Sequence, residues 1–345
     1  MPIFELKLFS VQHLTFMKRY TLLLAAICAL GSTARASSLP SDSIEEGTKD
    51  SILVLRDIEE AARIDSAILC YYEDLLLFTD ELYSSDDLAL PDSLPHFTGE
   101  DYRLRLSTMD ARTPFDLSYN SVVEAFIHLY VSKKRELSAA CLRRSDQYFP
   151  LFEETFDRYG LPLELKYLSV VESALDPKAR SRAGATGLWQ FMYGTGKVFG
   201  LKINSYVDER SDPVRSTEAA AKYLSYLHEM FGDWNLALAA YNCGEGRVAR
   251  AIRRSGGKKD YWDIYPFLPR ETRGYVPAFI AVNYLFEHAG DHYIFPKHGG
   301  FRSYEIDSVH VRQKVSFDVI AELLEMDVET VALLNPTYRL NVVPG

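Results

Sequence analysis

Apolar residues return at helical spacing along most of the chain, and this periodicity constrains its fold more than any other feature. Over residues 118–159, and again over about 271–288, they recur every three or four positions rather than at every second one. Between these stretches Gly160 ends one helical pattern and Pro162 begins the next, which is the usual order of these two residues at helix boundaries. The sequence therefore predicts a mainly α protein up to Gly290.

Two features interrupt the helical pattern. Pro150 predicts a turn between two helices, because proline has no backbone N–H and clashes with the preceding helical turn. Near the end of the chain, alternating valines over 309–315 resemble a strand and are followed by helical runs over 317–325 and 328–334. We therefore expect a small strand–helix–helix segment over residues 301–345.

Length and charge limit the classes of protein to consider. A chain of 345 residues is expected to form about two domains, at roughly 150 residues each. The proline-containing, acidic stretch 84–98 is expected to connect domains. The chain has 38 basic and 48 acidic residues, a net charge of −10. Binding to a phosphate backbone depends on clustered Lys and Arg, so we expect no nucleic-acid partner.

The first 36 residues have the pattern of a secretory signal. Lys18 and Arg19 precede a short apolar run over 20–30, and the small residues Ala34 and Ala36 come just before a cleavage site after Ala36. The apolar run is too short to cross a bilayer, which takes about 20 residues. We expect translation to begin at Met17, and residues 1–36 to be removed on export, leaving no transmembrane span in the mature chain.

Cys28 offers an alternative to simple export. A lipoprotein would be anchored through this cysteine, but Ile27 stands before it where a small residue is expected, and the apolar run continues beyond it. After the leader, residues 37–50 are rich in Ser, Asp and Glu and are expected to be flexible. Order is expected to begin near Ser51, with a helical region over 51–116.

A single carboxylate lies among leucines in the predicted helix that follows Pro162. At about 100° per residue, Glu172 falls in the same narrow arc as Leu165, Leu168 and Leu175. An unpaired carboxylate on an apolar face either finds a partner or keeps its proton, because burial disfavours the charged form. A carboxyl with such a raised pKa can act as a general acid.

Three further blocks carry polar residues beside glycines. The first runs from Ser181 to Met192 and contains Gln190, whose amide offers donors and an acceptor. The second places Tyr241 and Asn242 at a helix end before Gly244, and the third reads Glu-Thr-Arg-Gly-Tyr-Val over 271–276.

These blocks resemble the lytic transglycosylases of the soluble-transglycosylase (SLT) type, most closely the branch of membrane-bound lytic murein transglycosylase D. The family's Glu-Ser pair and Gly-Ala-x-Gly-Leu-x-Gln run match residues 172–173 and 184–190. Its Ala-Tyr-Asn-x-Gly block matches 240–244, and its Glu-Thr-Arg-x-Tyr-Val block matches 271–276. The segment 309–336 resembles a LysM sugar-binding module that lacks a full second strand before Gly345.

The resemblance implies a lysozyme-like catalytic domain over residues 117–290. It implies a peptidoglycan lyase that cleaves the β-1,4 bond between N-acetylmuramic acid and N-acetylglucosamine without water, leaving 1,6-anhydro ends. The partners are then peptidoglycan glycan strands, and the location is the periplasm, at the cell wall. An outer-membrane lipoprotein remains the alternative if Cys28 is lipidated.

The resemblance also assigns roles to residues. Glu172 is the catalytic acid and base, with no metal and no cofactor. The side chains expected to bind the glycan are Gln190, Tyr241, Asn242, Glu271 and Tyr275. Two alternatives stay open at this point: a muramidase that uses water, and a catalytically silent peptidoglycan-binding protein.

Overall fold

The computed structural model describes residues 4–9, 95–296 and 306–344. These residues form two compact units, the larger from 95–296 and the smaller from 4–9 together with 306–344. The segment 37–50, residues 51–94 of the expected helical region and most of the predicted leader lie outside the described residues, whereas α3 (Gly99–Asp110) lies in the described part of that helical region.

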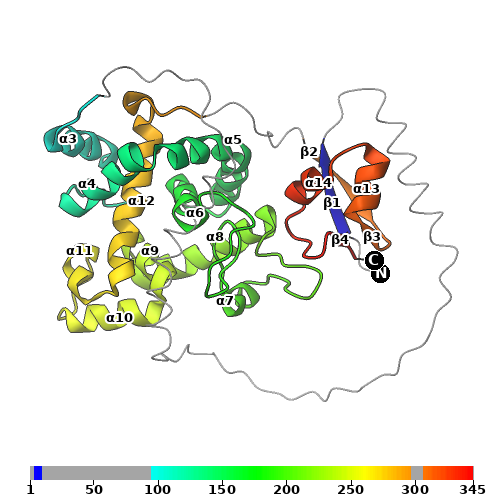
Figure 1. Cartoon of the computed structure of the whole chain (residues 1–345). Helices are drawn as coiled ribbons and strands as arrows, with labels where there is room; N and C mark the ends of the chain where they lie inside the picture. Colours follow the sequence, from blue (N-terminus) through cyan, green and yellow to red (C-terminus); the bar gives the residue numbers. More distant parts are fainter. Residues whose placement is uncertain (1–3, 10–94, 297–305, 345) are drawn as a thin grey trace, which may run out of the picture. The chain divides into compact units, whose positions relative to one another are not determined.

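The larger unit consists of helices joined by turns and by two longer irregular segments, residues 174–192 and 199–212 (Figure 1). Its α-helices are α3 (Gly99–Asp110), α4 (Ser121–His128), α5 (Arg135–Arg158), α6 (Lys166–Ser173), α7 (Tyr193–Val198), α8 (Pro213–Phe231), α9 (Trp234–Cys243), α10 (Glu245–Arg254), α11 (Tyr261–Ile264) and α12 (Arg270–His288). Shorter helical turns are η3 (Leu129–Lys133), η4 (Leu163–Leu165), η5 (Tyr265–Phe267) and η6 (Gly290–His292). The prediction of a mainly α chain is confirmed.

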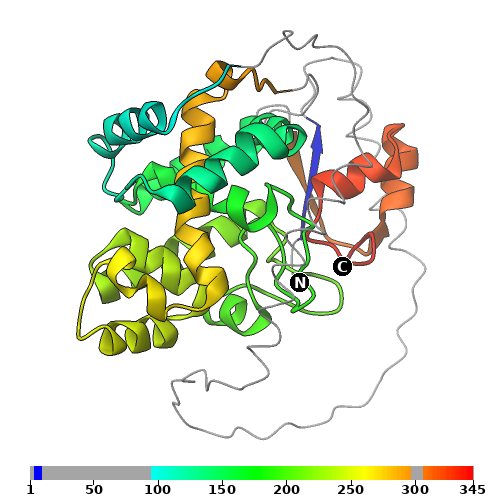
Figure 2. The same ribbon diagram turned by 60° about the vertical axis from the view of Figure 1, so that its left-hand side comes forward.

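Helix α12 runs through the larger unit, and α4, α6 and α9 pack against it (Figures 1 and 2). Its residues 275–285 are buried almost without interruption, and residues 236–240 of α9 are fully buried. A helix that is apolar on every side lies in the middle of a core. These two helices therefore provide a rigid support for side chains at their ends.

Helix α5 corrects one expectation from the sequence. It continues from Arg135 to Arg158 through Pro150, where the sequence predicted a turn. Proline inside a helix costs about 3 kcal/mol. Tyr148, Phe152 and Phe156 on the same helix are buried, and a buried side chain of this kind stabilises by roughly 1.5–3 kcal/mol. Packing of this apolar face outweighs the proline.

The smaller unit combines two short helices with two antiparallel strand pairs. Its elements are β1 (Phe4–Phe9), β2 (Ile306–Val311), β3 (Val315–Ser316), α13 (Phe317–Leu324), α14 (Val328–Leu334) and β4 (Val342–Val343). Strand β1 pairs with β2, and β3 pairs with β4. The strand and both helices expected after residue 301 are present.

The strand β1 comes from the other end of the chain. Leu6 is fully buried, and Lys7 is bound through its backbone by the side-chain amide of Asn335. The Lys7 N–H donates to Asn335 Oδ1 over 2.7 Å, and Asn335 Nδ2 donates to the Lys7 carbonyl over 2.8 Å. The sequence suggested that this unit lacks a full second strand, and residues 4–9 supply one. They also lie within the segment predicted to be removed on export.

Within the described residues, no helix is both long and apolar enough to cross a membrane.

We predict that starting the chain at Met17 exposes the backbone of β2. Without β1, the N–H groups of β2 that face it lose their partners, so hydrogen exchange at residues 306–311 should accelerate by at least tenfold. Amide exchange followed by mass spectrometry measures this, with the buried helix α9 of the same protein as the internal control. Equal protection of β2 in the full and the shortened chain would contradict the pairing.

Candidate active site

The centre of the candidate site is the end of helix α6, where Glu172 lies. The helix ends at Ser173 because Ala174 and Leu175 both adopt left-handed backbone conformations, with φ of 50° and 61°. Leu168 and Leu175 are fully buried, while Glu172 is half-buried. The leucines that share its face of the helix therefore surround the Glu172 carboxyl with apolar groups, while part of the Glu172 side chain stays accessible to solvent.

This environment keeps Glu172 protonated. Burial raises the pKa of Glu172 from 4.5 to about 8, although a hydrogen bond from Tyr275 opposes the shift. The Tyr275 hydroxyl donates to Oε1 of Glu172 and is itself buried on α12. A carboxyl that holds its proton near neutral pH can donate it to a leaving group.

Tyr241 comes to the same place from α9. Its hydroxyl donates to the carbonyl oxygen of Trp189 over 2.8 Å. Burial raises the pKa of Tyr241 well above its ordinary value, and the nearby charge of Glu172 raises it further. Tyr241 is therefore a neutral phenol, fixed in orientation, within electrostatic range of the Glu172 carboxyl.

Asn242 joins the end of α9 to the start of α12. Its Oδ1 accepts a hydrogen bond from Thr272 Oγ1 over 2.8 Å. Its Nδ2 donates to no group in the described part of the chain, so these N–H groups are open to a ligand. Glu271, the residue before Thr272, lies half-buried in the first turn of α12, one helical turn before Tyr275.

The site loop, residues 180–191, lies beside α6. Ser169 and Ser173 both donate through Oγ to the carbonyl oxygen of Leu188, at 2.9 and 3.0 Å. Gln190 uses its Nε2 to donate to the carbonyl oxygens of Ala179 and Gly187, at 3.1 and 2.9 Å. Among the described residues nothing donates to Gln190 Oε1, so Gln190 offers a ligand an acceptor.

The structure thus brings Glu172, Tyr241 and Tyr275 together, and adds Asn242 through Thr272 and Gln190 through the site loop. The contact between Tyr275 and Glu172 was not anticipated, since the sequence suggested only a glycan contact for Tyr275. No local pattern reveals it, because the two residues are 103 positions apart.

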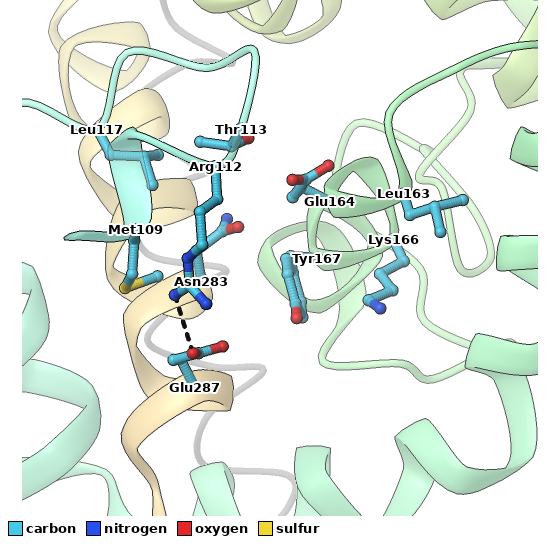
Figure 3. A pocket seen from close by; sticks show the side chains of 10 residues that line it. All are labelled: Met109, Arg112, Thr113, Leu117, Leu163, Glu164, Lys166, Tyr167, Asn283 and Glu287. Carbon is cyan, nitrogen blue, oxygen red and sulfur yellow. Dashed lines mark hydrogen bonds and ion pairs between the residues drawn. The ribbon is translucent and has the colours of Figure 1, made fainter. Parts of the chain in front are cut away.

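A cavity of the larger unit is lined by other residues. It has a volume of about 360 Å³, and η4 and the start of α6 contribute to its lining (Figure 3). The residues that line it are Met109, Arg112, Thr113, Leu117, Leu163, Glu164, Lys166, Tyr167, Asn283 and Glu287. Arg112 and Glu287 form an ion pair at 3.1 Å across its lining. None of the predicted site residues lines this cavity.

No group of three or more His, Cys, Asp or Glu side chains that could hold a metal ion occurs in the described part of the chain. The described side chains of the candidate site offer a carboxyl, two phenols and amide groups.

Comparison with known proteins agrees with the motif blocks. Residues 150–264 match the transglycosylase SLT domain, and residues 305–345 match the LysM-like domain of lytic transglycosylase MltD. The resemblance predicted from the sequence is confirmed by these two matches.

Membrane-bound lytic murein transglycosylase D of Escherichia coli K12 is 35% identical over 216 residues, which cover 60% of this chain and 46% of that protein. Soluble lytic murein transglycosylase of Escherichia coli K12 is 34% identical over 148 residues, covering 39% of this chain and 23% of that protein. The crystal structure of the 70 kDa soluble lytic transglycosylase from Escherichia coli matches with 31% identity and a TM-score of 0.36, covering 43% of this chain and 25% of that chain. The chain thus spans less than half the length of these relatives.

We predict that Glu172→Gln stabilises the fold at alkaline pH. Because the pKa of Glu172 is raised from 4.5 to about 8, the folded protein keeps a proton that the unfolded chain has lost. The contribution of this carboxyl to stability is therefore fully present below pH 4.5 and is lost as the pH rises to about 8. Glutamine does not ionise, so the variant should gain about 2 kcal/mol at pH 8, discounted for the partial exposure of Glu172.

Denaturant unfolding at pH 8 and below pH 4.5 measures the difference. The control is Glu154→Gln, which removes an exposed carboxyl on α5 and should change stability by less than about 0.5 kcal/mol at either pH. A gain for Glu172→Gln that is equal at both pH values would be inconsistent with a buried, protonated carboxyl.

Proposed function

We propose that this chain, which carries an SLT domain and a LysM-like domain, is a peptidoglycan lytic transglycosylase. It cleaves the β-1,4 bond between N-acetylmuramic acid and N-acetylglucosamine and leaves a 1,6-anhydro end on the muramic acid. The observation that carries the proposal is the Glu172 carboxyl, which holds its proton to a pH of about 8 while remaining partly accessible.

In the first step, Glu172 donates its proton to the glycosidic oxygen, and the bond between that oxygen and C1 breaks. The N-acetylglucosamine leaves with a hydroxyl group, and positive charge develops at C1 of the muramic acid. The substrate's own acetamide stabilises this charge. Glu172 is now a carboxylate, and its environment favours the return of a proton.

In the second step, the C6 hydroxyl of the same sugar attacks C1 while Glu172 takes its proton. This closes the 1,6-anhydro ring and restores the protonated carboxyl. One residue therefore serves first as acid and then as base. General acid–base catalysis of this kind increases the reaction rate by about 10² to 10⁴. Attack from within the same sugar also avoids recruiting a second molecule.

The surroundings of Glu172 favour this route over hydrolysis by two carboxylates. Hydrolases of that kind place a second Asp or Glu about 5–9.5 Å from the acid. Burial and the Tyr275 hydroxyl are the causes of the shifted pKa of Glu172, and the charge of Glu271 in the first turn of α12 is not among them. A lone carboxyl is sufficient for a reaction in which the substrate supplies its own nucleophile.

The polar groups around Glu172 suit a glycan. Asn242 presents free amide donors and Gln190 a free amide acceptor, which match the carbonyl and the N–H of sugar acetamide groups. Glu271 adds a carboxylate on the neighbouring turn of α12, suited to hydroxyl donors. Tyr241 and Tyr275 act mainly through Glu172, by fixing its carboxyl and its surroundings.

The remaining parts of the proposal concern location and attachment. Residues 1–36 act as an export leader, and the mature protein works on the wall in the periplasm. The alternative is cleavage before Cys28, whose lipidation would attach the mature protein to a membrane. The LysM-like unit over 305–345 binds glycan strands and keeps the catalytic domain close to its substrate.

The test is digestion of purified sacculi by the wild-type protein and by Glu172→Gln, with the products weighed by mass spectrometry. The wild type should release muropeptides with anhydro ends, each lighter by one water than the hydrolysed product. The variant should release fewer by a factor of at least 10², because it has no proton to donate.

Each other outcome points to a different function. Reducing ends in place of anhydro ends would establish a hydrolytic muramidase. Binding to sacculi without lysis by either protein would establish a silent wall-binding protein.

A further inference from the structure

Arg210 is a buried cation that the proposed reaction does not use. Only about 5% of Arg210 is exposed, and its partner Asp208 is 6% exposed. Arg210 Nε donates to Asp208 Oδ1 over 2.9 Å, and Arg210 Nη2 donates to Asp208 Oδ2 over 2.8 Å, so the ion pair is bidentate. A buried ion pair has a large desolvation cost, and good geometry with additional hydrogen bonds is needed to offset it.

The remaining nitrogen of Arg210 binds the site loop. Nη1 donates to the carbonyl oxygen of Gly184 over 2.8 Å and to that of Phe191 over 3.1 Å. These two residues stand at opposite ends of the segment that carries Gln190. Asp208 fixes the plane of the guanidinium, so one planar group joins both ends of the loop.

The loop also closes on the backbone of Arg210. A Cβ atom at Gly187 would lie 1.9 Å from the carbonyl oxygen of Arg210, so only glycine permits this approach. Gly187 also has a φ of +86°, which side chains rarely adopt. Arg210 therefore meets the loop through both its side chain and its main chain.

Two carbonyl groups of the segment so held accept hydrogen bonds from residues of the Glu172 region, and Gln190 follows them directly in the chain. The Leu188 carbonyl accepts from Ser173, the residue next to Glu172, and the Trp189 carbonyl accepts from Tyr241. Gln190 has a left-handed backbone with φ of 45°, a strained conformation for a residue other than glycine that costs of the order of 1–3 kcal/mol. Such a conformation persists only when its surroundings impose it.

We propose that Arg210 is a positioning residue for the glycan-cleaving site. Its guanidinium, oriented by Asp208, holds Gly184 and Phe191 so that Gln190 presents its open carbonyl oxygen to the substrate. The proposal rests on the proposed function for its kinetic consequences. The effect of Arg210 on the conformation of the site loop does not depend on the proposed function and can be measured without any assay of catalysis.

The first test is a double-substitution cycle on soluble glycan strands, using Arg210→Lys, Gln190→Ala and both together. Lysine keeps the charge but loses the planar fork, so it cannot bind Asp208 and both carbonyl groups at once. Each single variant should lower kcat/KM by roughly 10- to 100-fold, the scale expected from small misplacements in an active site. Since both act through Gln190, the double variant should lose little more than either single one.

The matched control is Arg158→Lys, which alters the ion pair of α5 with Glu218, where both side chains are partly exposed and the site loop is not involved. It should retain kcat/KM within about twofold, as expected for a surface pair. The proposal would be overturned if the losses of kcat/KM in Arg210→Lys and Gln190→Ala multiply in the double variant. Full activity of Arg210→Lys would overturn it as well.

The second test follows the loop itself by NMR. In the wild type the side-chain amide of Gln190 is bonded to Ala179 and Gly187, so its two N–H signals should be distinct and slow to exchange. In Arg210→Lys they should exchange at least tenfold faster while the thermal unfolding of the protein stays cooperative. Unchanged exchange of the Gln190 amide would overturn the proposal for Arg210. A wild-type protein without lytic activity would contradict only the proposed function, and the exchange measurement would still test the role of Arg210.

Discussion

A carboxyl that is to donate a proton at neutral pH has to be removed from water without being sealed off, and the fold around Glu172 meets both demands. The left-handed residues Ala174 and Leu175 stop α6 directly after it, so the carboxyl stands at a helix end rather than along a covered face. Burial raises its pKa to about 8, and the Tyr275 hydroxyl orients it while limiting that rise. Under the proposed function, the balance of these two effects sets the pH range in which Glu172 acts as an acid.

The rest of the larger unit supports this balance. The fully buried segments of α9 and α12 carry Tyr241 and Tyr275 on rigid elements, and Thr272 joins the ends of these helices through Asn242. The site loop is attached to α6 through the Leu188 carbonyl and to α9 through the Trp189 carbonyl. Under the proposed function, catalysis by Glu172 depends on these fixed surroundings, because they hold its carboxyl in position.

Much of this arrangement could be predicted from periodicity and motif spacing, and the exceptions share a physical reason. The leucine arc located Glu172, and the helices around it followed from apolar spacing. The prediction of a turn at Pro150 was wrong, because the packing of α5 outweighs the cost of a proline inside a helix. The contacts of Tyr275 and Arg210, and the strand around Leu6, join residues far apart in the chain, and such pairings leave no local signal.

The central claim is that Glu172 is protonated at neutral pH, and a direct titration of its carboxyl tests it. Carbon-13 NMR of protein labelled at the glutamate carboxyls, with the Glu172→Gln spectrum subtracted, isolates this one signal between pH 3 and pH 10. The account predicts a midpoint at a pH of about 8. A midpoint near 4.5, the ordinary value for glutamate, would contradict it.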